Sequence, residues 1–362
     1  MRLWLAPSAF FPHRGGVEET TYQLALSFAA AGDEVLVVTH RHPRELAERE
    51  SLAGVDVRRV EFGAPRARAL AAGRYLRNVW EVQRTLDAIA PRPELIHVQC
   101  VSGQVPHLLL FARRHSIPLV VSTQGEVLMD ADAIFQRSAY LRFVLRLASR
   151  RASALSACSA WTAQHTAAVA AGFAAATVIP NGVRPAEWLL DPVPREPILC
   201  AWGRHVPQKG FDLAIEAFAR LRESVGDARL LIGGGGAETE HLRKIARSGV
   251  EFVGPLDRNG VRELLAASRV AVVPSRIEPF GIVALEALAA GRGLVYAAGT
   301  GLVEAAGGLG RAADPRDANA LAVAMAAELA EPTPAVAGRD RAAQLSWERI
   351  AGAYHELYAR AC

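Results

Sequence analysis

Residues 2–39, RLWLAPSAFFPHRGGVEETTYQLALSFAAAGDEVLVVT, contain the pattern that decides the fold. Arg2–Ala6 and Glu34–Thr39 are short apolar runs typical of buried β-strands, and Glu18–Ala31 between them has the spacing of an amphipathic helix. A strand, a helix and a second strand in this order form a unit whose strands run parallel. The stretch therefore predicts a parallel sheet covered by helices.

The alternation of apolar runs and helical segments continues to residue 180 and then starts again. Leu95–Val98 and Leu119–Ser122 are further buried strands of the first set. Residues 180–197 contain PNGVRP and DPVPREP, and such a density of proline is typical of a linker. Strands of the second set are predicted at 197–202, 229–232, 251–253, 270–274 and 294–297. Helices are predicted at 212–222, 238–248, 260–267 and 346–358.

The two sets of strands predict an α/β protein with two doubly wound, Rossmann-like parallel-sheet domains. We expect these domains at 1–183 and 184–345, followed by a C-terminal helix within 346–362. Ligands of such sheets bind at the carboxyl ends of the strands, so a cleft between the domains would be lined by both sites.

The composition of the chain fits a globular protein and excludes several classes. Its 362 residues, 51% of them hydrophobic, are enough for two ordinary domains and argue against disorder. Four cysteines are too few for a disulfide scaffold. The net charge is +4, but the arginines are spread along the whole chain, so we expect no nucleic-acid partner.

Nothing in the sequence resembles an export signal or a membrane span, and we therefore expect a cytoplasmic protein. The cysteines are far apart and form no CxxC pair, which indicates reduced, buried thiols. A local basic group in the first domain favours an ordinary solvated helix face over contact with a membrane surface. Its members are Arg66, Arg68, Arg74 and Arg77.

Lysine is rare in this chain, and one of its two lysines lies beside a tight turn. Of the 41 basic residues only Lys209 and Lys244 are lysines. In WGRHVPQKG, residues 202–210, Arg204 follows a predicted strand and Lys209 comes five residues later. Two cations at the carboxyl edge of a parallel sheet are well placed to bind a diphosphate. The alternative is a surface loop with two solvated charges.

The segment PSRIEPFGIVALE, residues 274–286, carries two glutamates on a strand-to-helix connection. The amides of Phe280 and Gly281 at the predicted helix start favour an anion. Glu286 follows Glu278 by eight residues, about 12 Å along a helix, so the two carboxylates would reach different parts of one elongated ligand. A ribose diol would be a suitable partner for a glutamate on this apolar segment.

Glycine-rich turns occur elsewhere, and each has an ordinary structural explanation. Gly15 and Gly16 lie between the first strand and the first helix, where a phosphate could approach the helix amides, although taken alone they favour an ordinary turn. Neither 233–238 nor 299–304 completes GxGxxG, and no GxxxxGK[ST] exists. The sequence therefore gives little support to a nicotinamide dehydrogenase or a P-loop NTPase.

Together these segments resemble the retaining glycosyltransferases of family 4, which have the GT-B fold. The resemblance rests on Phe11–Glu18, Pro180–Val183, Gly203–Gly210, Phe252–Pro255, Glu278–Glu286 and Ser346–Ile350. It implies an acceptor domain, a nucleotide-sugar donor domain facing it across a cleft, and a C-terminal helix that packs back on the first domain.

The resemblance also implies roles for individual residues. Arg204 and Lys209 would neutralise the donor diphosphate, Glu278 would hold sugar hydroxyls, and Glu286 would bind the ribose. The remaining donor-binding residues would be Gly15, Gly16, Val253, Leu256, Phe280, Gly281 and Ile282, with the base near Val253–Leu256. Since two fixed cations can do the work of a metal ion, no metal and no cofactor are expected.

The chain departs from the family pattern on the acceptor side. Gln124 stands where the family often has a histidine, and it can donate or accept a hydrogen bond but cannot carry an imidazolium proton. Arg184 replaces the usual aspartate after Asn-Gly-Val. We hypothesise that Glu126 or the nearby Asp130 or Asp132 contacts a polar or cationic acceptor, although a solvated loop explains these carboxylates as well.

The expected activity is transfer of a sugar from a nucleotide-sugar, with retention, to a small-molecule, glycan or lipid-linked acceptor. Two alternatives stay open at this point: a nucleotide-sugar 2-epimerase of the same fold, and a non-catalytic protein that binds nucleotide-sugars. No motif names the base, the sugar, the acceptor or an oligomeric state.

Overall fold

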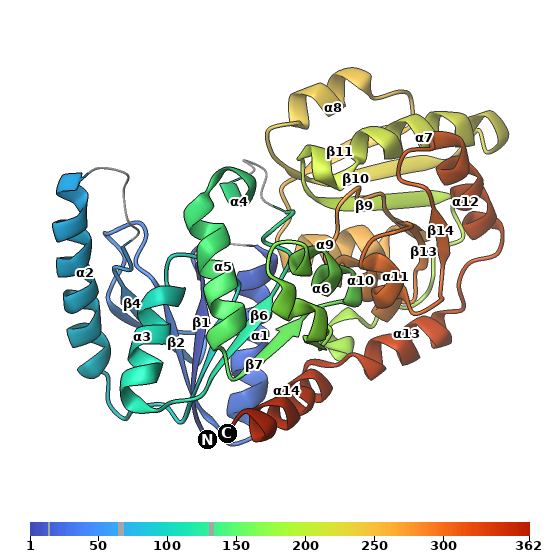
Figure 1. Cartoon of the computed structure of the whole chain (residues 1–362). Coiled ribbons are helices and arrows are strands. Elements are labelled where there is room, and N and C mark those ends of the chain that lie inside the picture. Colours follow the sequence, from blue (N-terminus) through green and yellow to red (C-terminus); the bar gives the residue numbers. More distant parts are fainter. Residues whose placement is uncertain (14, 64–68, 130–133) are drawn as a thin grey trace. The chain divides into compact units, whose positions relative to one another are not determined.

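The computed structural model describes residues 1–13, 15–63, 69–129 and 134–362 (Figure 1). The chain divides into two compact units, which are described separately. Unit 1 contains residues 1–180 and 347–362, and unit 2 contains residues 181–346. The division lies at Pro180, where the sequence suggested residue 183, and it assigns the C-terminal residues to the unit that begins the chain.

Unit 1 is built on an eight-stranded sheet in the order β3-β4-β2-β1-β5-β6-β7-β8. Every pairing is parallel except that of β3 with β4, which is antiparallel. The strands are β1 (Arg2–Pro7), β2 (Glu34–His40), β3 (Arg49–Leu52), β4 (Val55–Val60), β5 (Leu95–Gln99), β6 (Leu119–Thr123), β7 (Ala154–Ala157) and β8 (Thr177–Val178). Its helices are α1 (Gly16–Ala30), α2 (Ala69–Asp87), α3 (Val105–His115), α4 (Ile134–Arg137), α5 (Ala139–Arg151), α6 (Ala160–Ala167) and α14 (Trp347–Ala361).

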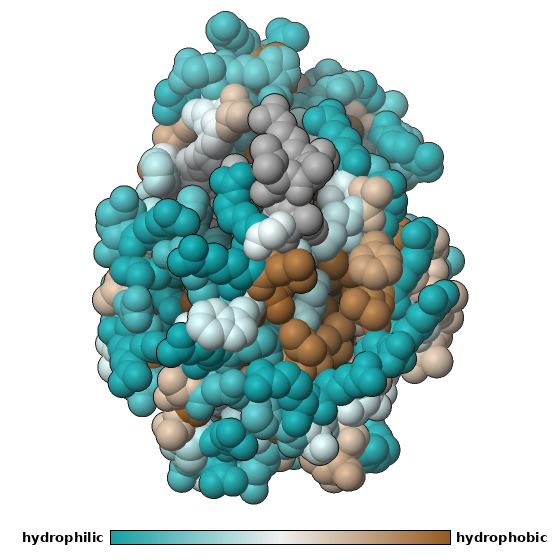
Figure 2. Space-filling view, turned by 60° about the vertical axis from the view of Figure 1, so that its left-hand side comes forward, coloured by the Kyte–Doolittle hydropathy of each residue, from teal (hydrophilic) through white to brown (hydrophobic). Residues whose placement is uncertain are grey.

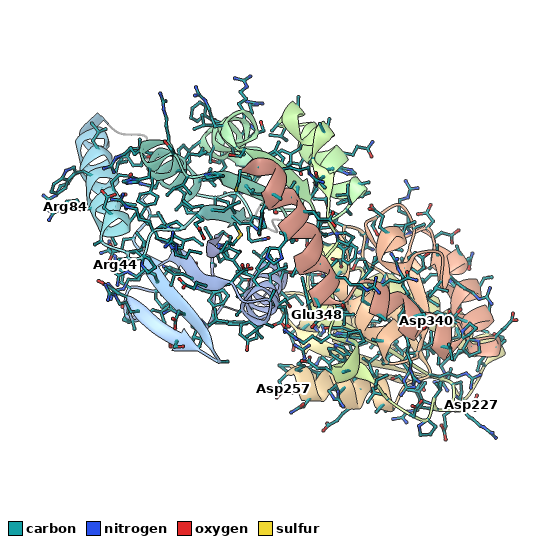
Figure 3. The ribbon with its side chains drawn as sticks, turned by 90° about the horizontal axis from the view of Figure 1, so that it is seen from below. Arg44, Arg84, Asp227, Asp257, Asp340 and Glu348 are labelled. Atoms are coloured by element: carbon teal, nitrogen blue, oxygen red, sulfur yellow. The ribbon has the colours of Figure 1, made fainter. Side chains whose placement is uncertain are left out.

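The two faces of the unit 1 sheet are covered differently. Ile96, Val98 and Val121 belong to a large apolar cluster that extends to residues of α3 and α5. The opposite face lies under α14, which contacts β6, β7 and α1. Figure 3 shows α14, with Glu348 in its first turn, lying along this sheet.

Unit 2 is a parallel sheet of six strands in the order β11-β10-β9-β12-β13-β14. Counted from its own first strand this is the order 3-2-1-4-5-6 of dinucleotide-binding sheets, whose ligands bind where the order reverses. The strands are β9 (Ile198–Arg204), β10 (Arg229–Gly235), β11 (Val250–Gly254), β12 (Val270–Val273), β13 (Gly293–Ala297) and β14 (Arg311–Ala313). The helices are α7 (Phe211–Ser224), α8 (Thr239–Ile245), α9 (Arg258–Ala266), α10 (Ile282–Ala289), α11 (Leu302–Ala306), α12 (Ala318–Ala330) and α13 (Ala335–Gln344).

The expected linker is packed into unit 2. Residues 185–188 form a 3₁₀ turn that contacts α10 and α13, and the Trp188 side chain is fully buried. Burial of the large Trp188 side chain stabilises the ordered turn by more than the conformational entropy that the segment loses. This proline-rich stretch is therefore part of the unit and does not act as a flexible linker.

Cys100, Cys158 and Cys200 are buried and free as expected, but Cys362 is exposed because it follows the end of α14. On the face shown in Figure 2, apolar residues gather between hydrophilic ones. Arg77 of α2 forms an ion pair with Glu81 one turn later, as on a solvated helix face, whereas Arg66 and Arg68 lie outside the described residues.

Candidate active site

Lys209 and Glu278 meet at the carboxyl edge of the unit 2 sheet. The Lys209 Nζ atom donates to Glu278 Oε2 over 2.6 Å, and Ser275 Oγ donates to the same oxygen over 3.2 Å. The Glu278 side chain is almost fully buried, and its charge is therefore stable only with such partners. The pair joins two segments that the sequence analysis selected separately.

The turn that carries Lys209 depends on a glycine. Gly210 has a φ of 67°, in the left-handed region, and a Cβ atom there would lie 2.2 Å from the Pro274 carbonyl oxygen. The loop after β9 can therefore approach the end of β12 this closely only with glycine at this position. The close approach brings the Lys209 turn against the segment that contains Glu278.

A second ion pair, which the sequence analysis missed, holds the same two loops together. The Arg276 guanidinium donates to both carboxylate oxygens of Asp212, each over 2.7 Å, and to the Pro207 carbonyl over 3.0 Å. Desolvation acts to raise the pKa of Asp212, but the hydrogen bonds and charge of Arg276 outweigh it and the pKa is lowered. The position of Arg276 two residues before Glu278 was the available signal.

Arg204 is the last residue of β9 and lies at the same edge of the sheet. Its side chain is exposed, and the part of the chain that the structure describes contains no ion pair to it. The three charged groups therefore differ: Lys209 and Glu278 neutralise each other, whereas Arg204 carries a positive charge in solvent.

The start of α10 is shaped by close backbone packing. Gly281 has a φ of 97°, and a Cβ atom there would lie 2.3 Å from Leu302 Cδ2. The Gly301 amide donates to the Glu278 carbonyl over 2.8 Å, so the loop after β13 lies against the Glu278 segment. Phe280 is buried, whereas Ile282 and Glu286 on α10 are partly exposed.

The glycine run at the end of β10 has a structural role. A Cβ atom at Gly234 would lie 1.9 Å from the Gly203 carbonyl oxygen, and one at Gly233 would lie 2.4 Å from Leu256 Cδ1. These glycines let β10 pack against the end of β9 and against the segment after β11. Val253 in that region is 45% exposed.

In unit 1, α1 begins at Gly16, two residues before the predicted start at Glu18, so Gly15 and Gly16 form the helix start itself. Gly15 caps the helix in an extended conformation, and a Cβ atom at Gly16 would meet nothing within 4 Å. Neither glycine has a positive φ. Neither the backbone conformation nor the packing of Gly16 therefore requires glycine. Close approach of a ligand to the helix start is a reason for glycine that agrees with both observations.

Gln124 and Glu126 lie just beyond the end of β6. Glu126 accepts hydrogen bonds from the backbone amides of Val101 and Gln124, both over 2.8 Å, and from Thr123 Oγ1 over 3.0 Å. Burial raises the pKa of Glu126, while these hydrogen bonds act to lower it. The contacts connect the ends of β5 and β6, a structural role beside the hypothesised acceptor contact. Asp130 and Asp132 lie outside the described residues.

The described ranges hold no group of three or more His, Cys, Asp or Glu side chains arranged to bind a metal ion. In the same ranges, no helix combines the length and the apolar character needed to cross a membrane.

Each of the two units matches a family of glycosyltransferases. Residues 15–182 match the family described as "Glycosyl transferase 4-like domain", and residues 196–331 match "Glycosyl transferases group 1". A glycogen synthase from Mycobacterium tuberculosis is 32% identical over 95% of this chain and 91% of that protein. The chain therefore belongs to the group 1, family 4-like glycosyltransferases.

Solved structures share the fold at lower identity. A sucrose-phosphate synthase from Thermosynechococcus elongatus has a TM-score of 0.80 at 24% identity, covering 99% of this chain and 98% of that chain. Anabaena HepE in complex with UDP-glucose has a TM-score of 0.76 at 19% identity, covering 99% of each chain. These likenesses confirm the predicted fold class.

Proposed function

We propose that this glycosyltransferase moves a sugar, with retention of configuration, from a nucleotide-sugar donor to a hydroxyl group of a small-molecule, glycan or lipid-linked acceptor. The observation that carries the proposal is the Lys209–Glu278 pair, which lies with Arg204 at the carboxyl edge of a 3-2-1-4-5-6 sheet. The glycogen synthase relative and the UDP-glucose complex of HepE support a nucleotide-sugar as donor.

The chemistry follows from the charges. When the glycosidic bond breaks, negative charge develops on the leaving diphosphate, and fixed cations stabilise that charge most. Arg204 supplies a charge that no carboxylate of the described residues neutralises. Lys209 is bonded to Glu278, and in the proposed complex it also contacts the diphosphate. The ion pair therefore sets the distance between the phosphate and the Glu278 carboxylate, which holds the sugar hydroxyls.

The rest of the donor extends along the same edge. The amides of Phe280 and Gly281 face the phosphate, Glu286 and Ile282 lie toward the ribose, and the base lies near Val253 and Leu256. For unit 1, the family resemblance assigns Gly15 and Gly16 to the donor phosphate and Gln124 to the reacting sugar, and the proposal adopts these roles. The proposal includes no cofactor and no metal ion, since Arg204 supplies a positive charge and Lys209 keeps N–H donors for the diphosphate beside its bond to Glu278, and it places the enzyme in the cytoplasm.

A thermal-shift panel of UDP-, GDP-, ADP- and dTDP-sugars on the full chain tests donor binding. A donor that binds only the folded state stabilises it by about 2.7 kcal/mol at a hundred times its Kd. We expect one donor to raise the Tm of the parent, and Lys209→Ala and Glu278→Ala to lose that shift and sugar transfer. Lys244→Ala, the matched lysine on the exposed side of α8, keeps both.

The same panel contains the results that would contradict the proposal. Sugar transfer at the parental rate by Lys209→Ala or Glu278→Ala would contradict the assignment of these residues to the donor site. Formation of an epimer from the donor in the absence of any acceptor would favour a 2-epimerase, and donor binding without transfer or hydrolysis would favour a binding protein.

A further inference from the structure

The sheet face that α14 covers in unit 1 is lined with polar side chains. On this face β5 begins with Leu95 and continues with His97 and Gln99, and the neighbouring strands place Val120 and Ala154 beside His97 and Ser122 and Ser156 beside Gln99. The four polar residues gather toward the carboxyl ends of the strands. All four side chains are at most 1% exposed. A buried sheet face is ordinarily apolar, as the opposite face is here, so this polar layer needs an explanation.

The polar layer forms a continuous hydrogen-bonded path. His97 Nδ1 lies 2.6 Å from Tyr358 Oη of α14, and His97 Nε2 lies 2.5 Å from Ser122 Oγ. The Gln99 amide nitrogen lies 3.1 Å from His97 Nε2, and Gln99 Oε1 accepts from Gln124 Nε2 over 3.0 Å. The path therefore begins on the C-terminal helix and ends at the side chain of Gln124.

The chemistry of His97 gives this path a direction. Complete burial lowers the pKa of His97 to about 3, so its ring is neutral and has one donor and one acceptor nitrogen. If Nε2 is the unprotonated nitrogen, it can accept from Ser122 Oγ and from the Gln99 amide, and the Nδ1–H then donates to Tyr358 Oη. The carboxamide of Gln99 is thereby oriented, because its nitrogen faces His97 and only its oxygen is directed to Gln124.

The main chain of Gln124 is held separately. Its backbone amide donates to Glu126 Oε2, and the next residue, Gly125, has a φ of 93°. Two anchors thus act on one residue: Glu126 fixes its backbone, and Gln99 fixes its side chain. The anchors come from the end of β5 and from the loop after β6, at the edge where ligands of parallel sheets bind.

We propose that Gln99 is a positioning residue, which takes its orientation from His97 and Tyr358 and transmits it to the carboxamide of Gln124. The inference rests on the proposed function, in which Gln124 contacts the reacting sugar. Gln99 touches no substrate; it acts through Gln124 by restricting that side chain to one orientation. Buried, fully paired polar networks are suited to this task because breaking any link leaves a polar group unsatisfied.

A double-mutant cycle tests the proposal. Gln99→Met and Gln124→Met keep the length of the side chains and remove their hydrogen bonds. We expect Gln124→Met and Gln99→Met each to lower kcat about tenfold or more, with the KM for the donor within about twofold. Because both act through the same carboxamide, the double variant will equal Gln124→Met within about twofold.

Gln83→Met is the matched control. Gln83 is another buried glutamine of unit 1, and it donates to the His107 carbonyl and accepts from Arg114. We expect it to lower the Tm without lowering kcat. Tyr358→Phe keeps the packing of α14 but breaks the contact with His97, so it will lower kcat in the same direction as Gln99→Met.

The proposal is overturned if Gln99→Met or Gln124→Met has the parental kcat. It is also overturned if the fold-loss of kcat in the double variant is the product of the two single losses, or if Gln83→Met loses as much kcat as Gln99→Met. Parental kcat in Gln124→Met leaves the proposed function intact if Lys209→Ala is still inactive. Normal transfer by Lys209→Ala, in contrast, contradicts the donor site whatever the cycle shows.

Discussion

Lys209 occupies a position that suits an ammonium group. Its Nζ atom lies 2.6 Å from Glu278 Oε2, and its side chain is only 17% exposed. A guanidinium is planar and longer, and it would have to displace the carboxylate or turn away from it. We expect Lys209→Arg to lower kcat at least about tenfold, measured by steady-state transfer with the donor found in the thermal-shift panel.

Lys244→Arg is the control for this change. Lys244 is the only other lysine of the chain, and it lies exposed on α8. We expect parental kcat and KM for this variant. If Lys209→Arg is as active as Lys244→Arg, the compact ammonium group has no special role.

His97 gives unit 1 a dependence on pH. Its pKa is lowered from 6.5 to about 3 by burial, so below pH 6.5 the unfolded chain takes up a proton that the folded chain excludes. The contribution of His97 to the free energy of unfolding is complete above pH 6.5 and decreases as the pH falls toward 3. Between pH 7 and pH 5 the loss is about 2 kcal/mol.

Urea unfolding of the parent and of His97→Gln at both pH values measures this loss. The other histidines are the same in both proteins, so the difference between the two pH dependences isolates His97. We expect the parent to lose about 2 kcal/mol more than the variant. Equal losses would contradict a neutral, buried His97.

The sequence predicts individual residues of the site better than the contacts between them. Lys209 was selected as a rare lysine beside a tight turn after a predicted strand, and Glu278 as the carboxylate that ends a strand-to-helix loop. Their direct pairing could not be predicted, since it depends on Gly210 allowing the loop to approach Pro274. Arg276 was missed because its position two residues before Glu278 is a weak signal in an arginine-rich chain, and its partner Asp212 could not be placed beside it from the sequence.

At the scale of elements, two loops of unit 2 behave as one. Arg276 joins the loop after β12 to the first turn of α7 through Asp212, and to the Lys209 turn through the Pro207 carbonyl. The pair is partly exposed, so we expect Arg276→Met to change the free energy of unfolding by less than about 1 kcal/mol. Donor KM will nevertheless rise about fivefold or more, because the two loops lose their common anchor.

Arg229→Met is the matched control for this loop anchor. Arg229 also forms a two-point ion pair, with Glu251 at 2.9 Å, but it begins β10 and therefore lies at the opposite edge of the sheet. We expect neither the stability nor the donor KM to change by more than the experimental error. A donor KM that rises equally in both variants would show a general effect of charge.

The strands predicted from apolar runs are present, whereas β3, β4, β7, β8 and β14 were not predicted, although β4 (VDVRRV) does carry alternating valines. The predicted strands rich in valine, leucine and isoleucine lie within two residues of their expected positions, except that β10 continues three residues further, to Gly235. β7 reads ALSA and β14 reads RAA, and neither contains the β-branched residues that mark a strand. These strands form because neighbouring strands pair with them, which is a tertiary effect. α8 ends at Ile245, before the predicted 248.

At the scale of the whole molecule, the chain forms unit 1, then unit 2, and returns to unit 1 with α14. Family resemblance suggested this return, whereas the apolar pattern alone indicated only a last helix. What the sequence could not indicate is that α14 covers a polar sheet face. The polar residues His97, Gln99, Ser122 and Ser156 are separated in the sequence. They become neighbours only when β5, β6 and β7 pair in their observed register.

The return of the chain makes a prediction about Tyr354, which is buried on α14. The centroid of its ring lies 4.8 Å from the ring centroid of His97 and 6.4 Å from the ring centroid of Phe28 on α1. Removing a buried aromatic side chain leaves a cavity, so we expect Tyr354→Ala to lower the free energy of unfolding by about 3 kcal/mol or more. Val336→Ala on α13, where the side chain is 70% exposed, will have no such effect.

Hydrogen exchange of the full chain locates the loss caused by Tyr354→Ala. Although Tyr354 follows unit 2 in sequence, its contacts belong to unit 1, so amides of β5, β6 and β7 will lose protection while those of β9, β12 and β13 keep theirs. The reverse pattern would contradict the assignment of α14 to unit 1. Equal loss in both sheets would mean that the two units unfold together, in which case the stability of the donor site also depends on the last helix of the chain.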